Sequence, residues 1–339
     1  MWKFATLLSF AVGATVIAGQ IQGQGATLDW AYGYVTPGPE PLAPPCPDEA
    51  KAYACSRPGR PWPDDGALLR LGGSDRTFTI SQVQSHYDPA DWYPQDHPAA
   101  VPDIVQHGRQ KDLVRACAHC HYHNGLGKPE NGHVSGQPVN YFLQQIALFR
   151  SGGRKSADPR KANHAEMVQI ARTITDEEAR AAAVYYGSIK WKPWVTVIES
   201  ETAPKTRQSA AGLFIPLEGN QAEPLGQRII EVPEFPDRTE RYRDPRAGFV
   251  AYVPVGSIER GRALVTTGAG KTTQCALCHG RDLQGVGDAP GIADRTASYT
   301  ARQLYNMQQG TRLSPLMKPV VASLSRDDII AIAAYLASL

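Results

Sequence analysis

Two short stretches decide the fold: CAHCH at residues 117–121 and CALCH at residues 275–279. In each, two residues separate a pair of cysteines, and a histidine follows the second cysteine directly. A structural zinc site would need a second pair of ligands at a readable spacing. The remaining cysteines, Cys46 and Cys55, lie far upstream of both stretches. The pattern therefore favours another use of paired thiols.

Each stretch opens a longer repeat. A tyrosine follows the first cysteine by 24 positions, a glycine and an arginine follow that tyrosine by 11 and 13, and a second tyrosine follows a methionine by 18. The two series are Cys117, Tyr141, Gly152, Arg154, Met167, Tyr185 and Cys275, Tyr299, Gly310, Arg312, Met317, Tyr335. The first series has eight additional residues between arginine and methionine. Such self-similarity predicts two duplicated units.

The Cys-x-x-Cys-His pattern is typical of c-type haem attachment. Two thiols bind the vinyl groups of the haem, and the adjacent imidazole becomes the proximal iron ligand. The sequence therefore predicts two covalently attached haem c groups. Their attachment residues are Cys117, Cys120, Cys275 and Cys278.

On these motifs the sequence resembles the class I cytochromes c, and in particular their tandem dihaem members. The resemblance covers roughly residues 105–190, called here the first unit, and 257–339, the second unit. It implies a small helical domain around each haem, and a proximal and a distal ligand for each iron. The implied iron ligands are His121, Met167, His279 and Met317.

Some assignments around the irons stay open at this stage. His164 lies three residues before Met167 and competes with it as a distal ligand. The proline that follows the attachment motif in the family is present as Pro290, but the first unit has Gly132 and His133 at that place. Which backbone carbonyl orients the first proximal imidazole is therefore in question.

Two arginines recur in register and are candidates for pairing with haem propionates. They are Arg154 and Arg312. Arg154 belongs to a basic cluster, residues 150–161, of which we expect much to be solvated. Met307, in the middle of its expected helix, is assigned to core packing.

Helix signals flank both motifs. Capping boxes are expected to begin the last helix of each unit, with Thr175 and Glu178 in the first and Ser325 and Asp328 in the second. Ser257 is expected as the N-cap of a helix that leads into the second motif.

The helix after the first motif has its own signals. Pro138 suits a first helical position, and Gly152 suits the left-handed position after the last turn. Each unit should then bury its last helix against its first helix and the haem.

The flanks and the connection complete the expected organisation. Residues 1–26 read as a secretory signal, with an uncleaved anchor as the alternative. Residues 27–104 form a proline-rich extension, whose aromatic residues suggest a coat on the haem domains. Residues 191–256 contain short β-rich runs and should form a small sheet. Because export would place the chain in an oxidising compartment, we also predict a disulfide between Cys46 and Cys55.

The predicted fold class is mainly α: two class I cytochrome c domains in tandem, joined by a segment with short β-strands and preceded by a proline-rich extension. The nearly balanced charge, 35 Lys and Arg against 33 Asp and Glu, argues against a nucleic-acid partner. Membrane association is expected only through an uncleaved N-terminus or a partner. Redox proteins, namely a dehydrogenase, an oxidase or a respiratory complex, are the expected partners.

Closed His and Met ligation of both irons would leave no position for a substrate. The resemblance therefore implies a periplasmic electron carrier without catalytic residues of its own. Two alternatives stay open: a cytochrome subunit of a periplasmic dehydrogenase, and a dihaem enzyme that acts as a peroxidase or oxidises thiosulfate.

Overall fold

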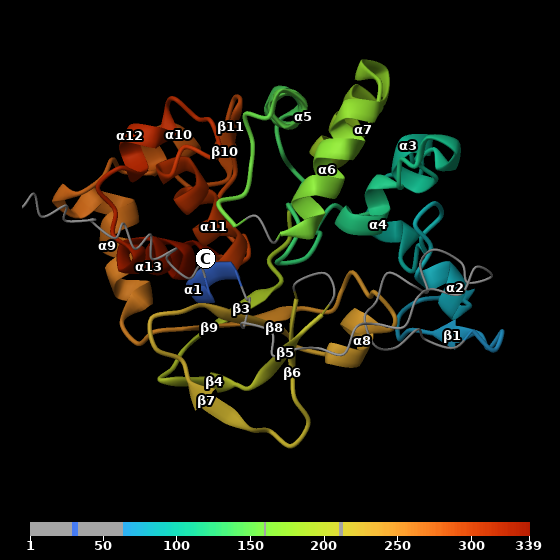
Figure 1. Ribbon diagram of the computed structural model, residues 1–339, viewed down its shortest axis with the longest axis horizontal. Helices are drawn as coiled ribbons and strands as arrows, with labels where there is room; N and C mark the ends of the chain where they lie inside the picture. Colours follow the sequence, from blue (N-terminus) through green and yellow to red (C-terminus); the bar gives the residue numbers. More distant parts are fainter. Residues whose placement is uncertain (1–28, 33–63, 159–160, 210–212) are drawn as a thin grey trace, which may run out of the picture.

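The computed structural model describes residues 29–32, 64–158, 161–209 and 213–339. The expected signal segment and the Cys46–Cys55 pair lie outside these residues. Figure 1 shows a helix-rich molecule in which the two units lie side by side above a layer of strands. Within the described residues, the longest apolar helices are too short to cross a membrane.

The first unit is built from helices. They are α3 (Asp103–Gln106), α4 (Cys117–His121), α5 (Val139–Ser151), α6 (Ala162–Thr173) and α7 (Asp176–Ser188). The capping box of Thr175 and Glu178 is confirmed, and so is the left-handed Gly152 (φ 76°) that ends α5. Pro138 is the N-cap of α5, one position before the expected one.

The second unit follows the same order. Its elements are α9 (Ser257–Thr267), η3 (Gly268–Gly270), α10 (Ala276–His279), β10 (Gly285–Val286), β11 (Ala289–Pro290), α11 (Ala297–Gln308), α12 (Met317–Val321) and α13 (Arg326–Ala337). The capping box of Ser325 and Asp328 is confirmed. The prediction for Ser257 was wrong: it is the first residue of α9, and the N-cap is Gly256 (φ 83°), which has no side chain. Glu199 of the connecting segment accepts from the Ile258 N–H at 2.7 Å instead.

The first helices of the two units differ. In the second unit α9 crosses α13 so closely that a Cβ on Gly261 would lie 2.0 Å from the carbonyl oxygen of Ala331. This crossing is the centre of an apolar core that also holds Met307, as predicted. In the first unit the corresponding α3 is a single turn, and other parts of the chain cover α4 instead.

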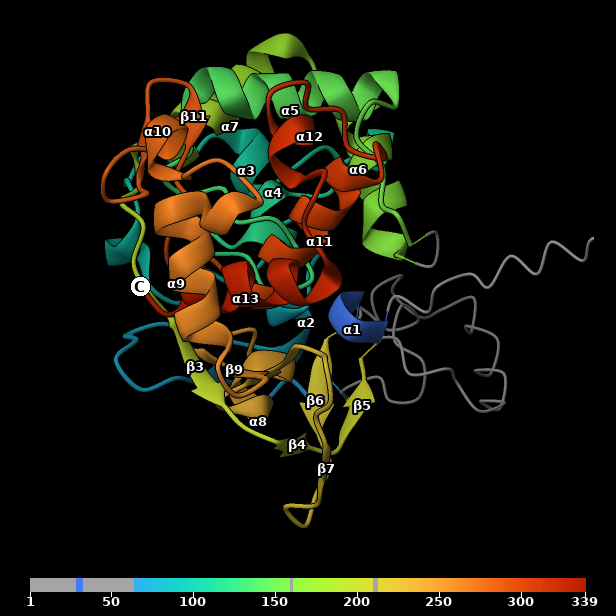
Figure 2. The same cartoon turned by 90° about the vertical axis from the view of Figure 1, so that its left-hand side faces the viewer.

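Residues 191–256 form a structure of short strands. They are β3 (Val195–Glu199), β4 (Thr202–Pro204), β5 (Thr206–Gln208), β6 (Phe214–Pro216), β7 (Ala222–Pro224), β8 (Ile230–Pro233) and β9 (Phe249–Val253), with the helix α8 (Pro236–Glu240) between the last two. Strands β3, β9 and β8 make one sheet, in which β3 runs parallel and β8 antiparallel to the central β9. The pairs β4–β7 and β5–β6 extend below it (Figure 2).

A buried carboxylate fastens this sheet to the second unit. Glu231 of β8 accepts hydrogen bonds from the first backbone N–H groups of α11, those of Ala297 (3.0 Å) and Ser298 (3.1 Å). These donors would otherwise be unsatisfied at the start of the helix. The charge is thereby compensated at the positive end of α11.

The described part of the extension contains only short elements. They are α1 (Asp29–Tyr32), β1 (Leu69–Arg70), β2 (Thr77–Phe78), α2 (Ile80–Val83) and η1 (Pro94–Asp96), followed by η2 (Gln110–Asp112) at the start of the first unit. Trp30 enters the core of the second unit and meets Tyr305 edge to face at 5.3 Å. Trp92 is buried and donates to the Tyr242 carbonyl at 2.8 Å. Trp30 thus packs on the second unit, whereas Trp92 packs within the extension and against the connecting segment.

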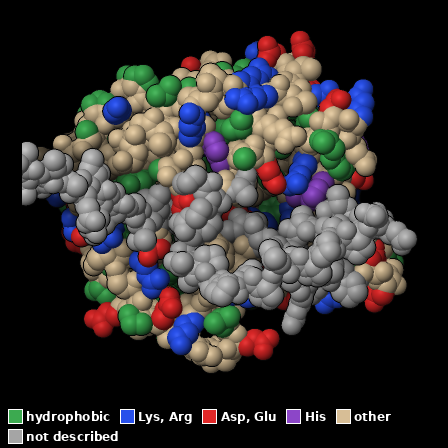
Figure 3. Space-filling view, viewed as in Figure 1, with side chains coloured by type: hydrophobic (Ala, Val, Ile, Leu, Met, Phe, Trp, Pro, Cys, Tyr) green, Lys and Arg blue, Asp and Glu red, His purple; other side chains and the backbone are tan. Residues whose placement is uncertain are grey.

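On the face drawn in Figure 3, basic and acidic side chains are interspersed over the described surface. This distribution agrees with the formal net charge of +2.

Candidate functional site

The two attachment motifs each form a short helical segment, α4 and α10, that ends at its histidine. Immediately afterwards the backbone turns to positive φ, at Tyr122 (58°) in the first unit and at Gly280 (82°) in the second. Burial raises the pKa of Cys117 to about 12 and that of Cys275 to about 11. The four motif cysteines form no disulfide within the described structure.

The imidazole of each motif histidine is oriented by a backbone carbonyl 11 positions later in the chain. The His121 Nδ1 atom lies 2.7 Å from the Gly132 oxygen, and the His279 Nδ1 atom lies 2.7 Å from the Pro290 oxygen. A carbonyl can only accept, so Nδ1 carries the proton in both rings and Nε2 keeps its lone pair. Burial lowers the pKa of both histidines, so the neutral form is favoured. Both rings are prepared to bind a metal through Nε2.

The structure shows which backbone carbonyl orients the His121 imidazole in the absence of the family's proline. Gly132 takes the place of the missing proline, and its carbonyl makes the same contact as that of Pro290.

The expected distal methionines lie in comparable surroundings. Met167 lies within α6 and Met317 begins α12; both are partly buried and line the same cavity as the attachment motifs. Three of the eight additional residues of the first unit lengthen the segment before α6, and the other five form the start of α6 ahead of Met167, whereas Met317 is the first residue of α12. His164 and Met307 also line this cavity.

The cavity is continuous between the units. It has a volume of about 930 Å³ and a mostly apolar lining to which both units contribute. Concave apolar sites with a few convergent polar groups are typical of cofactor sites. Among the described residues, no three His, Cys, Asp or Glu side chains gather as a metal site. The paired cysteines and the adjacent histidine of each motif, all of which line this cavity, fit covalently bound haem.

The two recurring arginines meet where the units join. Their backbones pair as an isolated antiparallel bridge, and their side chains bond to residues of both units. The hydrogen bonds are Arg154 to Tyr299 Oη (3.1 Å), Arg312 to Tyr141 Oη (2.6 Å), Arg154 to Gln145 Oε1 (3.0 Å) and Arg312 to Gln303 Oε1 (2.9 Å). The tyrosines and glutamines that the two arginines contact occupy equivalent positions in the repeat, so the contact between the units is nearly symmetric.

These two guanidinium groups have a surplus of positive charge. Burial and the neighbouring charge of Arg312 lower the pKa of Arg154. Within the described structure, both groups donate side-chain hydrogen bonds to tyrosine and glutamine oxygens. Buried cations need a counter-ion. An anionic group in the adjoining cavity, such as a carboxylate carried by a cofactor, would supply it.

Residues 257–336 match the family model described as cytochrome C oxidase, cbb3-type, subunit III. Cytochrome c-554(548) of Halomonas halodenitrificans (strain ATCC 12084 / NCIMB 8669) is 35% identical over 79 residues, which make up 23% of this chain and 89% of that protein. The chain belongs to the cytochrome c family. Covalently bound haem c is the cofactor that this family implies.

Two further relatives of this cytochrome carry the name thiosulfate dehydrogenase electron acceptor. The protein from Stutzerimonas stutzeri (strain A1501) is 41% identical over 64 residues, 18% of this chain. The chain spans only 30% of that relative. The protein from Thiomonas intermedia (strain K12) is 24% identical over 229 residues, which are 66% of this chain and 78% of that protein.

The surroundings of the two attachment helices in this cytochrome are unequal. Around α4, Ser85 accepts a hydrogen bond from His119 Nδ1 at 3.0 Å, the His86 carbonyl accepts one from the Ala116 N–H at 2.9 Å, and Arg243 donates to the His119 carbonyl. His119 is consequently only 9% exposed. The equivalent residue of the second unit, Leu277, is 71% exposed. Parts of the extension and of the connecting segment thus cover the first attachment helix.

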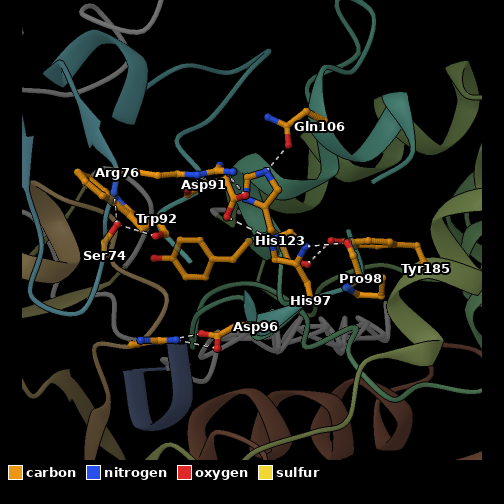
Figure 4. Close-up of polar contacts among 12 residues, drawn as sticks. Ser74, Arg76, Asp91, Trp92, Asp96, His97, Pro98, Gln106, His123 and Tyr185 are labelled. Carbon is orange, nitrogen blue, oxygen red and sulfur yellow. Dashed lines mark hydrogen bonds and ion pairs between the residues drawn. The ribbon is translucent and has the colours of Figure 1, made fainter. Parts of the chain in front are cut away.

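Figure 4 shows how polar contacts hold this cover in place. His123, just after the first motif, bonds Gln106 at 2.7 Å and stacks on His97 with ring centroids 5.4 Å apart. His97 in turn bonds Asp91 at 3.1 Å, and Asp91 pairs with Arg76 at 2.9 Å. His119 and His123 are therefore hydrogen-bonded residues of the first unit that contact this cover.

Sequence reasoning missed several residues of the site. Gln145 and Gln303 follow the repeated tyrosines at the same distance, a signal that was present and had no assigned role. His133 has no counterpart in the repeat, so no sequence signal indicated its role. In the basic cluster Lys155 is exposed, as expected, whereas Arg150, Arg154 and Lys161 are partly buried, and burial lowers the pKa of Lys161 to about 7.

Proposed function

We propose that this cytochrome carries two haems and transfers electrons in the periplasm, between a donor dehydrogenase or respiratory complex and an acceptor such as a terminal oxidase. The observation that carries the proposal is the duplicated ligand set. In each unit an imidazole with its Nδ1 committed to a carbonyl lines the same cavity as a methionine in register. The segment 1–26 supports export.

Each bound haem c supplies a one-electron iron couple. The chain's part is to close the coordination and exclude water. We assign His121 and His279 as proximal ligands and Met167 and Met317 as distal ligands. Ligation on both sides leaves no open position for oxygen or a substrate, which favours a carrier over an enzyme.

Arg154 and Arg312 serve this relay at the junction of the units. Their unpaired positive charges suit the haem propionates, and charge-assisted hydrogen bonds from arginine are strong and directional. Because the two side chains interleave, they would hold the propionate edges of both haems close to the same point. Short separation is what electron transfer between the units requires.

A thiosulfate dehydrogenase is the proposed electron donor. Two relatives carry the name of its electron acceptor, and the match to one of them, 229 residues, is longer than either unit. In a variant of this proposal, the cytochrome is a permanent subunit of such a dehydrogenase. The extension and the connecting segment then form the docking surfaces.

We place electron exchange with the partner at the second unit. Leu277 and Val286 are 71% and 62% exposed and stand beside the second attachment motif without lining the cavity, so a bound haem would not cover them. The equivalent positions of the first unit, His119 and Lys128, are buried. The accessible haem edge is therefore that of the second unit.

One observation favours the enzyme alternative for the first unit. His164 lies on α6 three residues before Met167 and lines the same cavity. A ligand exchange between the two would make the first iron switchable.

The test uses the purified holoprotein. Mixed with thiosulfate and a catalytic amount of a thiosulfate dehydrogenase, the oxidised protein should be reduced at both haems; thiosulfate alone should leave it oxidised. Leu277→Lys, at the exposed edge of the second unit, should slow this reduction several-fold. His119→Lys, at the covered edge of the first unit, is the matched control variant. Reduction by thiosulfate without the dehydrogenase, or prompt binding of carbon monoxide to the reduced protein, would overturn the carrier assignment.

A further inference from the structure

One helix of the second unit lies along the loop that orients the first proximal histidine. Residues of α11 and of the turn before it contact the loop at successive positions. The contacts are Arg295 with the Ser135 carbonyl, Thr296 with His133, Tyr299 with Gly132, and Arg302 with the Pro129 carbonyl. The reverse contact is slight, because α5 reaches the second unit's loop through Asn140 and Asp288 at 3.3 Å, both on the surface.

His133 is the polar centre of this contact. Its Nδ1 atom bonds the carbonyl of Leu126 across the loop, and its Nε2 atom lies 2.6 Å from the Thr296 hydroxyl. Since a carbonyl only accepts, Nδ1 must donate. Burial lowers the pKa of His133 to about 3, so the ring is neutral, and Nε2 accepts from the Thr296 hydroxyl and, at a longer 3.4 Å, from the Thr296 backbone N–H. Both nitrogens of the ring are thus used, one within the loop and one in the other unit.

The neighbouring Gly132 explains why the loop needs this support. A Cβ at position 132 would lie 3.3 Å from the Tyr299 hydroxyl, so the contact with the second unit favours glycine there. Glycine leaves the backbone free to rotate, whereas Pro290 fixes its own φ. The first unit therefore lacks the covalent restraint that the second unit has at the same carbonyl.

We propose that His133 is a positioning residue that holds the Gly132 carbonyl against His121, and that Thr296 of the second unit sets its position, so that the redox potential of the first haem depends on the contact between the units. This inference rests on the proposed function, since it requires a haem bound through His121. It makes the first site sensitive to its neighbour and leaves the second site independent.

The expected effect follows from the hydrogen bond of the proximal imidazole. A carbonyl that accepts from Nδ1 makes the imidazole a stronger donor to the metal. A stronger donor stabilises oxidised iron. Loosening the Gly132 carbonyl should therefore raise the potential of the first haem.

Thr296→Val tests the inference, because it keeps the shape of the side chain and removes the hydroxyl that Nε2 accepts from. Thr296→Ser restores the hydroxyl. Ser298→Ala is the matched control: it removes a buried hydroxyl from the same turn, but one that bonds Glu231. Midpoint potentials of both haems are measured on each holoprotein, with the two steps assigned by Met167→His and Met317→His variants. Haem content and thermal unfolding are recorded in parallel.

The inference predicts a positive shift of the first-unit potential in Thr296→Val alone, with the second-unit potential unchanged and Thr296→Ser like the wild type. His133→Asn, whose amide N–H can still donate to Leu126 but whose side chain is too short to place an acceptor at the position of Nε2, should shift the same step. If Thr296→Val lowers the melting temperature but leaves both potentials unchanged, His133 is only structural and the inference is wrong. A protein without two covalent haems would instead contradict the proposed function.

Discussion

At the scale of single residues, the two proximal sites reach the same geometry by different means. The distance from Nδ1 to the carbonyl oxygen is 2.7 Å in both units, although one carbonyl belongs to Gly132 and the other to Pro290. In the second unit the restraint is built into the proline ring. In the first unit it comes from side chains packed on the loop, with His133 bonded at both ring nitrogens.

The distal ligands are tested by replacing each methionine separately. Met167→Ala and Met317→Ala should each remove one iron–thioether absorption band and lower the potential of that haem, because a thioether ligand favours reduced iron. The other haem should be nearly unchanged. Visible spectra and redox titration measure both effects.

Met307→Leu is the control for the second unit, because Met307 lines the same cavity and is assigned to the core. Loss of the thioether band in this control, or its persistence in Met317→Ala, would show that the assignment of Met317 as the distal ligand is wrong. For the first unit, persistence of a low-spin spectrum in Met167→Ala would point to His164.

At the scale of elements, α13 is fastened at its start by a buried carboxylate. Asp328 accepts hydrogen bonds from Ser325 within its own cap and forms ion pairs with Arg260 of α9 (2.6 Å) and Lys271 (2.9 Å). Burial alone would raise the pKa of Asp328, but these hydrogen bonds outweigh it and lower the pKa far below the ordinary 3.8. The ionised carboxylate thus joins α13 to the helix that it crosses.

Asp328→Asn should therefore destabilise the second unit in a pH-dependent way. Because the pKa is lower in the folded state, the stabilisation is fully present above the unfolded value of about 3.8 and is lost as the pH falls through the folded value. The difference in unfolding free energy between wild type and variant should be large at neutral pH and shrink below about pH 4. Denaturant unfolding at several pH values measures it.

The neighbouring Asp327→Asn provides the comparison, since Asp327 is exposed and its nearest cation, on Arg326, is 3.8 Å away. Exposed pairs of this kind contribute about 0–1 kcal/mol. If the two variants lose stability equally, or if the effect of Asp328→Asn is independent of pH, the proposed role of the carboxylate fails.

The elements also show which parts of the fold are readable from sequence. Capping boxes and the glycine after α5 act within a few residues, so Thr175, Ser325 and Gly152 were predicted correctly. The two Cys-x-x-Cys-His stretches were readable directly, and the repeat counted from them placed the two arginines in register. The pairing of Arg154 with Tyr299 joins residues 145 positions apart, and it depends on how two folded units dock. No local pattern carries that information.

At the scale of the whole molecule, duplication and asymmetry coexist. The two units share one cavity, and their equivalent arginines and tyrosines interleave at the junction. Around this shared centre the surroundings differ: the extension and the connecting segment cover α4, while α10 faces solvent. The proposed path therefore has an accessible end at the second unit and a covered end at the first.

The central claim is that both units hold a working haem. Coulometric titration of the purified protein, followed by visible spectroscopy, tests it most directly, because it counts electrons per chain and reports the spin state of each step. We expect two one-electron steps per chain, both between low-spin forms. A single electron per chain, or a high-spin step that reveals an open iron position, would contradict the account.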